Sequence, residues 1–177
     1  MLPIQSFRFA MVITDTTSAG VEVTRVEGEW TTEALHLITT LSTAEGEQKT
    51  ESYLVGEVAY IQDAAGKWTK GPSGDPEAHR LMNPTLAMKQ AQETGGLILL
   101  PLGTTTVDGV ACVRYQVTPQ VGDDDVGSLF TQGIATVGLS NGWVYRFEFD
   151  RSEAGWQSQG FMFCTDYNTD ITIRAPI

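Results

Sequence analysis

The stretch of sequence that decides the fold is residues 133–151, GIATVGLSNGWVYRFEFDR. The dipeptide Asn141-Gly142 separates two runs of alternating residues, and Asn-Gly is a preferred sequence for a tight β-hairpin turn. One side of the second run carries Trp143, Tyr145, Phe147 and Phe149, and the other side carries Arg146, Glu148 and Asp150. This pattern predicts an antiparallel hairpin with one face in an apolar core.

Alternation of the same kind extends over most of the chain. The predicted strand regions are residues 6–13, 21–30, 34–41, 49–70, 97–102, 109–117 and 156–168, with 171–177 as a further candidate. Region 49–70 is expected to hold two or three strands, with a bend at Gly56 and a hairpin loop at Asp63–Gly66. We therefore expect about ten strands joined by short turns.

The strand pattern is interrupted once, between residues 71 and 96. Asp75-Pro76 and Asn83-Pro84 each have the form of a helix cap followed by proline at the first helical position. Gly95-Gly96 is a helix stop signal, so this block predicts two short helices. Residues 121–132, VGDDDVGSLFTQ, are a candidate for another short helix capped by its aspartates.

These elements predict a mainly β protein with short helices (α+β). Sequential strands without a βαβ rhythm favour an antiparallel sheet, and helices that arrive as one block favour a curled half-barrel with the helices covering its concave face. The length of 177 residues fits one domain over residues 1–177.

The charge balance limits the classes of partner. Lys and Arg number 11 against 22 Asp and Glu, for a formal net charge of -11. Such a surface repels phosphate backbones, which argues against nucleic acid binding. No apolar run reaches the ~18 residues of a membrane span, so no transmembrane segment is expected. The residues after Met1 do not have the pattern of a secretory signal, so a signal segment is expected to be absent from this chain.

The two cysteines, Cys112 and Cys164, are too far apart in sequence for a CxxC pattern. In the strand alternation, Cys112 is out of phase with Val113 and Tyr115, and Cys164 is out of phase with Phe161 and Phe163. Both cysteines are therefore expected on the side opposite the apolar lining. They form a disulfide if their strands are neighbours, and otherwise two buried thiols.

Large apolar side chains gather on one predicted face of many strands and on the helices. Such a surface is either an ordinary core or, where the helices leave it uncovered, a pocket for an apolar ligand. The candidate ligand-binding residues are Phe7, Phe9, Met11, Leu35, Leu37, Leu81, Met82, Leu86, Met88, Val113, Tyr115, Tyr145, Phe147, Phe149, Phe161 and Phe163.

No catalytic or metal site is predicted. The two histidines, His36 and His79, have no Cys, Asp or Glu at metal-ligand spacing, and each is expected on a strand or helix surface. No nucleophile elbow or phosphate-binding loop occurs. We therefore expect no cofactor and no enzymatic activity.

The order of these pieces resembles the LolA-like lipoprotein carrier superfamily, and within it the LppX/LprG-type lipoprotein domains. The resemblance covers nearly the whole chain. It runs through SFRFAMVI at 6–13, Gly28-Glu29-Trp30, the segment 53–60 leading to Trp68, the Asp-Pro helical segment, residues 107–115 and the turn at Asn141-Gly142. The chain departs from the family in having no N-terminal lipobox cysteine and no lid arginine that can be assigned.

The resemblance implies an extracytoplasmic protein of the periplasm, cell wall or cell surface that holds a lipid, acyl chain or lipoprotein anchor in an apolar half-barrel cavity. Other envelope proteins are expected as further partners, and peripheral contact with a membrane is compatible with this interpretation. The alternative is a cell-envelope interaction or sensor module with a filled core and no lipid. A hydrolase or isomerase in a lipocalin-like cup is the third hypothesis, and it requires convergent polar groups in the cavity.

Overall fold

A computed structural model describes residues 3–73, 78–120 and 132–177, apart from the side chains of Ala78 and Leu81. The strands are β1 (Ser6–Thr17), β2 (Gly20–Thr31), β3 (Ala34–Thr43), β4 (Gly46–Val55), β5 (Val58–Gln62), β6 (Trp68–Pro72), β7 (Leu97–Val107), β8 (Val110–Pro119), β9 (Gly133–Gly138), β10 (Val144–Glu153) and β11 (Trp156–Thr165). The helices are α1 (Ala78–Leu81) and α2 (Pro84–Glu93).

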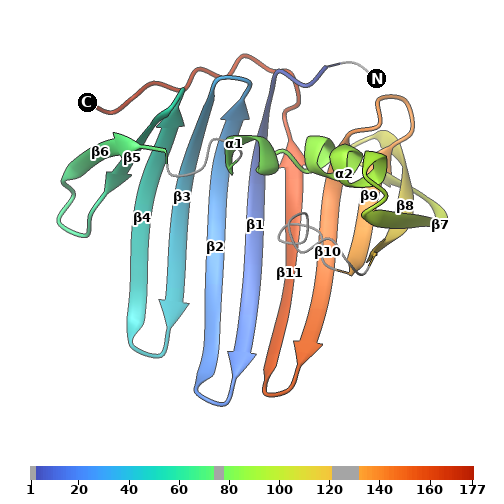
Figure 1. The fold of residues 1–177 in the computed structure, drawn as a ribbon, viewed down its shortest axis with the longest axis horizontal. Coiled ribbons are helices and arrows are strands. Elements are labelled where there is room, and N and C mark those ends of the chain that lie inside the picture. The colour runs from blue at the N-terminus through green and yellow to red at the C-terminus, as the bar shows by residue number, and fades with distance from the viewer. Residues whose placement is uncertain (1–2, 74–77, 121–131) are drawn as a thin grey trace.

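All eleven strands form one antiparallel sheet in the order β6-β5-β4-β3-β2-β1-β11-β10-β9-β8-β7. Two meanders make up this order, β1 to β6 on one side and β7 to β11 on the other. They join where the first strand pairs with the last, in the middle of the sheet (Figure 1). The two helices lie over one end of one face (Figure 1).

The predicted fold class is confirmed, because the sheet is a curled, open half-barrel of antiparallel strands with short helices on its concave face. The count of about ten strands was one short. Residues 171–177 form no strand. The caps predicted at Asp75-Pro76 and the helix predicted in 121–132 fall on residues 74–77 and 121–131, outside the described part of the chain.

Strand registers assign each side chain to a face. Phe7, Phe9 and Met11 of β1 point to the concave face, where they pair with Trp30, Gly28 and Val26 of β2. Between them, Arg8 and Ala10 point to the outer face. The same alternation continues through β3 and β4, so the concave face is apolar near the helices while the outer face is mixed in character.

Helix α2 begins where the sequence predicts. Asn83 is the N-cap, and its Oδ1 accepts hydrogen bonds from the backbone N–H groups of Thr85 and Leu86, both at 3.1 Å. Its buried residues include Ala87 and Met88, which pack against the β8–β10 part of the sheet. The Thr85 hydroxyl accepts from the N–H of Val144 at 2.9 Å and so ties the helix to β10.

Helix α1 is held by an aromatic contact. The Trp30 indole N–H donates to the carbonyl of His79 at 2.9 Å, and the two rings stack with centroids 5.1 Å apart. The His79 Nε2–H donates to the carbonyl of Thr31 at 2.8 Å. His79 therefore anchors the helix to the sheet, and the prediction that it lies on a helix surface was wrong.

Gly28 is required by close packing. The ring of Phe9, 4% exposed, lies directly over it, and a Cβ at position 28 would come within 2.3 Å of the Phe9 Cζ atom. Since Phe9 belongs to the core and its neighbours are close-packed, the ring has little room to move away.

We predict that Gly28→Ala destabilises the protein by about 1 to 3 kcal/mol, the usual cost of overpacking a core. Gly71→Ala is the matched control, because Gly71 also lies in a strand and a Cβ there meets nothing within 4 Å. Urea unfolding measures both free energies. Equal stability of the two variants would contradict the packing of Phe9 on Gly28.

Candidate functional site

Most predicted ligand-binding residues lie on the concave face and pack into its core. Buried members are Phe7, Phe9, Leu35, Met88, Tyr145 and Phe147, and the partly buried members that pack against them are Met11, Leu37, Met82 and Phe149. Val113 and Tyr115 are half-buried and pair with Val137 and Ala135 of the same face. Leu86 is 36% exposed on α2, and the side chain of Leu81 is outside the described residues.

Residues that the sequence did not single out complete this core. Tyr167, beyond the end of β11, has its ring 5.4 Å from that of Phe7 and 4.8 Å from that of Trp143. Trp30 stacks on Phe7 at 5.3 Å. Trp30 was visible in the sequence because it continues the alternation of Val26 and Gly28, whereas Tyr167 lies in a segment without periodicity.

The face predicted for β11 was wrong. Phe161 and Phe163 pair with Val12 and Ala10 of β1, which point to the outer face. Their neighbour Cys164 pairs with Phe9 and lies in the concave core. The run Phe161–Cys164 is apolar throughout, so its alternation does not reveal which side faces the core, and only pairing with β1 sets the phase.

Both cysteines are buried free thiols. Their strands, β8 and β11, are separated in the sheet by β9 and β10, so the condition for a cross-strand disulfide is not met. Both cysteines belong to the buried core that contains Phe7 and Phe9, so the prediction that they lie opposite the apolar lining was wrong. Burial raises the pKa of the Cys164 thiol to about 12 and also raises the pKa of Cys112.

We predict that neither cysteine reacts with a thiol-specific reagent in the native protein at pH 8. The Cys164 pKa of about 12 leaves a thiolate fraction on the order of one in ten thousand, and burial blocks access. In denaturant without reductant, both thiols of the chain should react. Reaction of fewer than two thiols, rising to two after a reductant is added, would show a disulfide.

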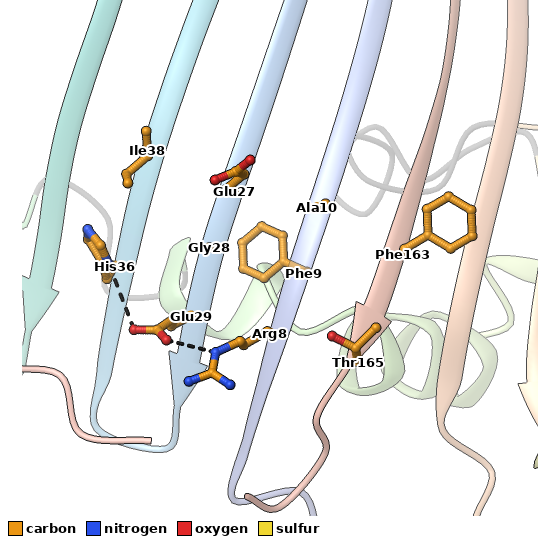
Figure 2. Close-up of a pocket in the computed structure, with 10 residues that line it drawn as sticks. All are labelled: Arg8, Phe9, Ala10, Glu27, Gly28, Glu29, His36, Ile38, Phe163 and Thr165. Atoms are coloured by element: carbon orange, nitrogen blue, oxygen red, sulfur yellow. Dashed lines mark hydrogen bonds and ion pairs between the residues drawn. The ribbon is translucent and has the colours of Figure 1, made fainter. Parts of the chain in front are cut away.

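The outer face carries a depression of about 470 Å³ (Figure 2). Its centre is Ala10, whose small side chain lies between Phe163 of β11 and Glu27 of β2, with Ile38 of β3 beyond. These residues form one row across four strands. A small residue between larger ones leaves a hollow in the sheet surface, and its floor is mostly apolar.

One wall of the depression is a chain of polar contacts across the sheet (Figure 2). Arg8 Nε donates to Glu29 at 2.9 Å, and a second Arg8 nitrogen lies 3.3 Å from Asp166. On the other side of Glu29, His36 Nδ1 lies 3.8 Å from the carboxylate, and His36 Nε2 lies 2.9 Å from Glu51. The wall is therefore fixed by contacts on every strand from β1 to β4.

Tyr53 continues this chain. Its hydroxyl donates to Glu51 at 2.8 Å, and its ring stacks on His36 with centroids 4.3 Å apart. The Tyr53 hydrogen bond lowers the pKa of Glu51, with His36 contributing as well. Burial, with the Glu51 bond second, raises the pKa of Tyr53 to about 12. The carboxylate and the phenol thus hold their ionised and neutral forms across the neutral pH range.

Two kinds of site can be assessed directly. Within residues 3–73, 78–120 and 132–177, no group of three or more His, Cys, Asp or Glu could hold a metal ion. Among the helices of that same part of the chain, none has the length and apolar character needed to cross a membrane.

No protein-family model matches the sequence, and no curated protein matches it. Solved structures do match. The lipoprotein LppX of Mycobacterium tuberculosis has a TM-score of 0.55 at 12% identity, with 97% of this chain and 90% of LppX covered. LprF of Mycobacterium bovis has a TM-score of 0.58 at 14% identity, with 98% and 90% covered. A LolA superfamily protein of Nitrosomonas europaea covers 97% and 89% at 12% identity, but its TM-score of 0.38 is too low to argue from.

At these identities the likeness concerns the fold alone. The chain therefore shares its overall fold with the lipoproteins LppX and LprF.

Proposed function

We propose that residues 1–177 act as one non-catalytic, extracytoplasmic binding domain that holds an acyl chain or lipid against the concave face of the sheet. The fold shared with LppX and LprF supports the class of protein and its extracytoplasmic location. The observation that carries the proposal is a band of apolar side chains that continues along the concave face beyond the helices.

This band lies on the long hairpins. On the concave face, Met11 and Leu37 pack against the core. Ile13 and Leu41 continue the same sides of β1 and β3 toward the hairpin ends, and all four side chains are half-buried. The hairpin ends of β1–β4, β10 and β11 extend well beyond α1 and α2 (Figure 1). The helix-covered end is filled by its own aromatic side chains, so we place the ligand on the band rather than among them.

Burial of a hydrocarbon chain supplies enough free energy for such binding. Each buried methylene contributes ~0.8 kcal/mol, so about ten of them contribute about 8 kcal/mol before the entropic costs of association. A net gain of about 8 kcal/mol corresponds to a Kd of about 1 μM, and each ~1.4 kcal/mol lost to ordering weakens binding tenfold from that limit.

The ionisable groups of the concave face favour non-covalent binding of a ligand over catalysis. Burial raises the pKa of Cys164 to about 12 and holds the pKa of Tyr167 well above its usual value. Both groups are therefore neutral at physiological pH and are poor nucleophiles and bases. The polar network of Glu51 and Tyr53 lies on the opposite face.

We predict that palmitate and a phosphatidylglycerol bind the purified protein, as detected by native mass spectrometry. The variant Ile13→Asp should weaken this binding by at least about tenfold, because it places a charge in the apolar band. Val12→Asp is the matched control, since Val12 is also half-buried on the same strand but points to the outer face. Unchanged lipid affinity in both variants, or no lipid binding by the wild-type protein, would contradict the proposal.

One observation favours the alternative of a protein-interaction module. The edge strand β7, LILLPLGTTTV, has no charged residue, and Ile98, Leu100 and Leu102 are 40%, 53% and 51% exposed. The other edge, β6, is short and carries Lys70 and Pro72, which protect an edge from pairing. Pro101 and the bulge beside it interrupt β7 but add no charge. An uncharged apolar edge suits the addition of a strand from a partner.

The alternative makes its own prediction. If β7 is an adhesive edge, the purified chain self-associates as its concentration rises, and Leu100→Lys abolishes this association by charging the edge. Leu139→Lys is the control, because Leu139 is 59% exposed and lies outside β7. Light scattering after size-exclusion chromatography measures the mass. A wild-type monomer at all concentrations, together with lipid binding, would reject the alternative.

A further inference from the structure

We propose that the depression on the outer face around Ala10 is a second binding site, specific for a small organic ammonium ion with an apolar body. This site lies on the face opposite the proposed lipid surface and goes beyond the proposed function. Nothing in the fold of a lipid carrier requires it, and it follows from the charges and shape of the depression.

The charges of the lining leave one carboxylate unmatched. Arg8 is engaged by Glu29 and Asp166, and Glu29 also faces His36. Glu27 is exposed and, among the described residues, has no hydrogen-bond or ion-pair partner. Its negative charge is therefore available to a ligand, and the net charge of -11 adds a field that attracts cations.

The floor of the depression indicates the chemistry of the rest of the ligand. Beside Glu27 lie the side chains of Ala10, Ile38 and Phe163, all in the same row of the sheet. A volume of about 470 Å³ is at the small end of ligand pockets. The hollow thus combines an apolar surface with a single anionic group at its side, and a compact hydrocarbon or aromatic group that ends in an ammonium matches both.

The wall is organised before the ligand arrives. Arg8, Glu29 and His36 hold one another across three strands, so binding orders few additional side chains (Figure 2). Arg146, the nearest cation beyond Phe163, is engaged by Glu148 at 2.7 Å. The charge of Arg146 is therefore balanced. Arg25, two residues from Glu27 on the same face of β2, contacts Ser42 at 3.5 Å, and Ser42 lies on the side of Arg25 away from Glu27.

The test is an NMR titration of the isotope-labelled full chain with phenethylammonium, and separately with phenethyl alcohol as its neutral counterpart. We expect shifts concentrated at Ala10, Glu27 and Ile38, with the alcohol bound more weakly. Glu27→Gln should lower affinity for the ammonium by about threefold to fivefold, the scale of an exposed ion pair, and leave the alcohol unaffected. Raising the salt concentration should also lower the affinity for the ammonium.

Two controls separate the site from general effects. Glu22→Gln makes the same charge change on β2 but on the other face, so it should preserve affinity. Ala10→Leu fills the hollow and should abolish binding of both probes, whereas Thr14→Leu places the same side chain elsewhere on the outer face of β1 and should not. The spectra report folding of each variant directly.

Three results would overturn the proposal: equal binding of alcohol and ammonium, equal loss in Glu27→Gln and Glu22→Gln, or shifts scattered over the molecule. Palmitate binding is measured on the opposite face, so the lipid site and the ammonium site can fail independently.

Discussion

The pairing of β1 with β11 is the constraint on which the rest of the structure depends. Each meander can form from neighbouring residues, but the two become one sheet only when the ends of the chain meet. Bringing the two ends of the chain together closes a long loop, which has an entropic cost. Dense contacts at the β1–β11 pairing, called the seam below, offset this cost. Tyr167 packs on Phe7, and Asn168 accepts from the backbone of Gln5 and donates to Pro3, at 2.7 and 3.1 Å.

This seam also sets which residues face the helices. Because Phe9 pairs with Cys164, the side chains of β11 and of the paired part of β10 take their faces from that register. Phe147 then meets α2 in the concave core, and Phe163 meets Ala10 on the outside. A shift of one residue at the seam would exchange these surfaces and remove both the helix packing and the outer depression.

The sequence predicts the elements and most of the faces, and it fails where one strand has apolar residues on both sides. Clean alternation, as in Phe7 and Phe9 or in Tyr145 and Phe147, identifies the core correctly. In β11 the alternation is lost, and the correct face follows only from a partner strand at the other end of the chain. The outer wall was also invisible, because Glu29, His36 and Glu51 come from three strands that alternation places side by side only when their registers are known.

A sheet one layer thick gives two chemically different surfaces to the same few residues. Phe9 and Gly28 fill the concave core, while Arg8, Ala10, Glu27 and Glu29 beside them shape the outer hollow. Burial keeps the Cys164 thiol of the apolar surface neutral, whereas on the outer surface the hydrogen bond from Tyr53 lowers the pKa of Glu51 and Arg8 pairs with Glu29. The strands therefore place an apolar core on one face and a network of charged side chains on the other, and the close fit of Phe9 over Gly28 lies between the two.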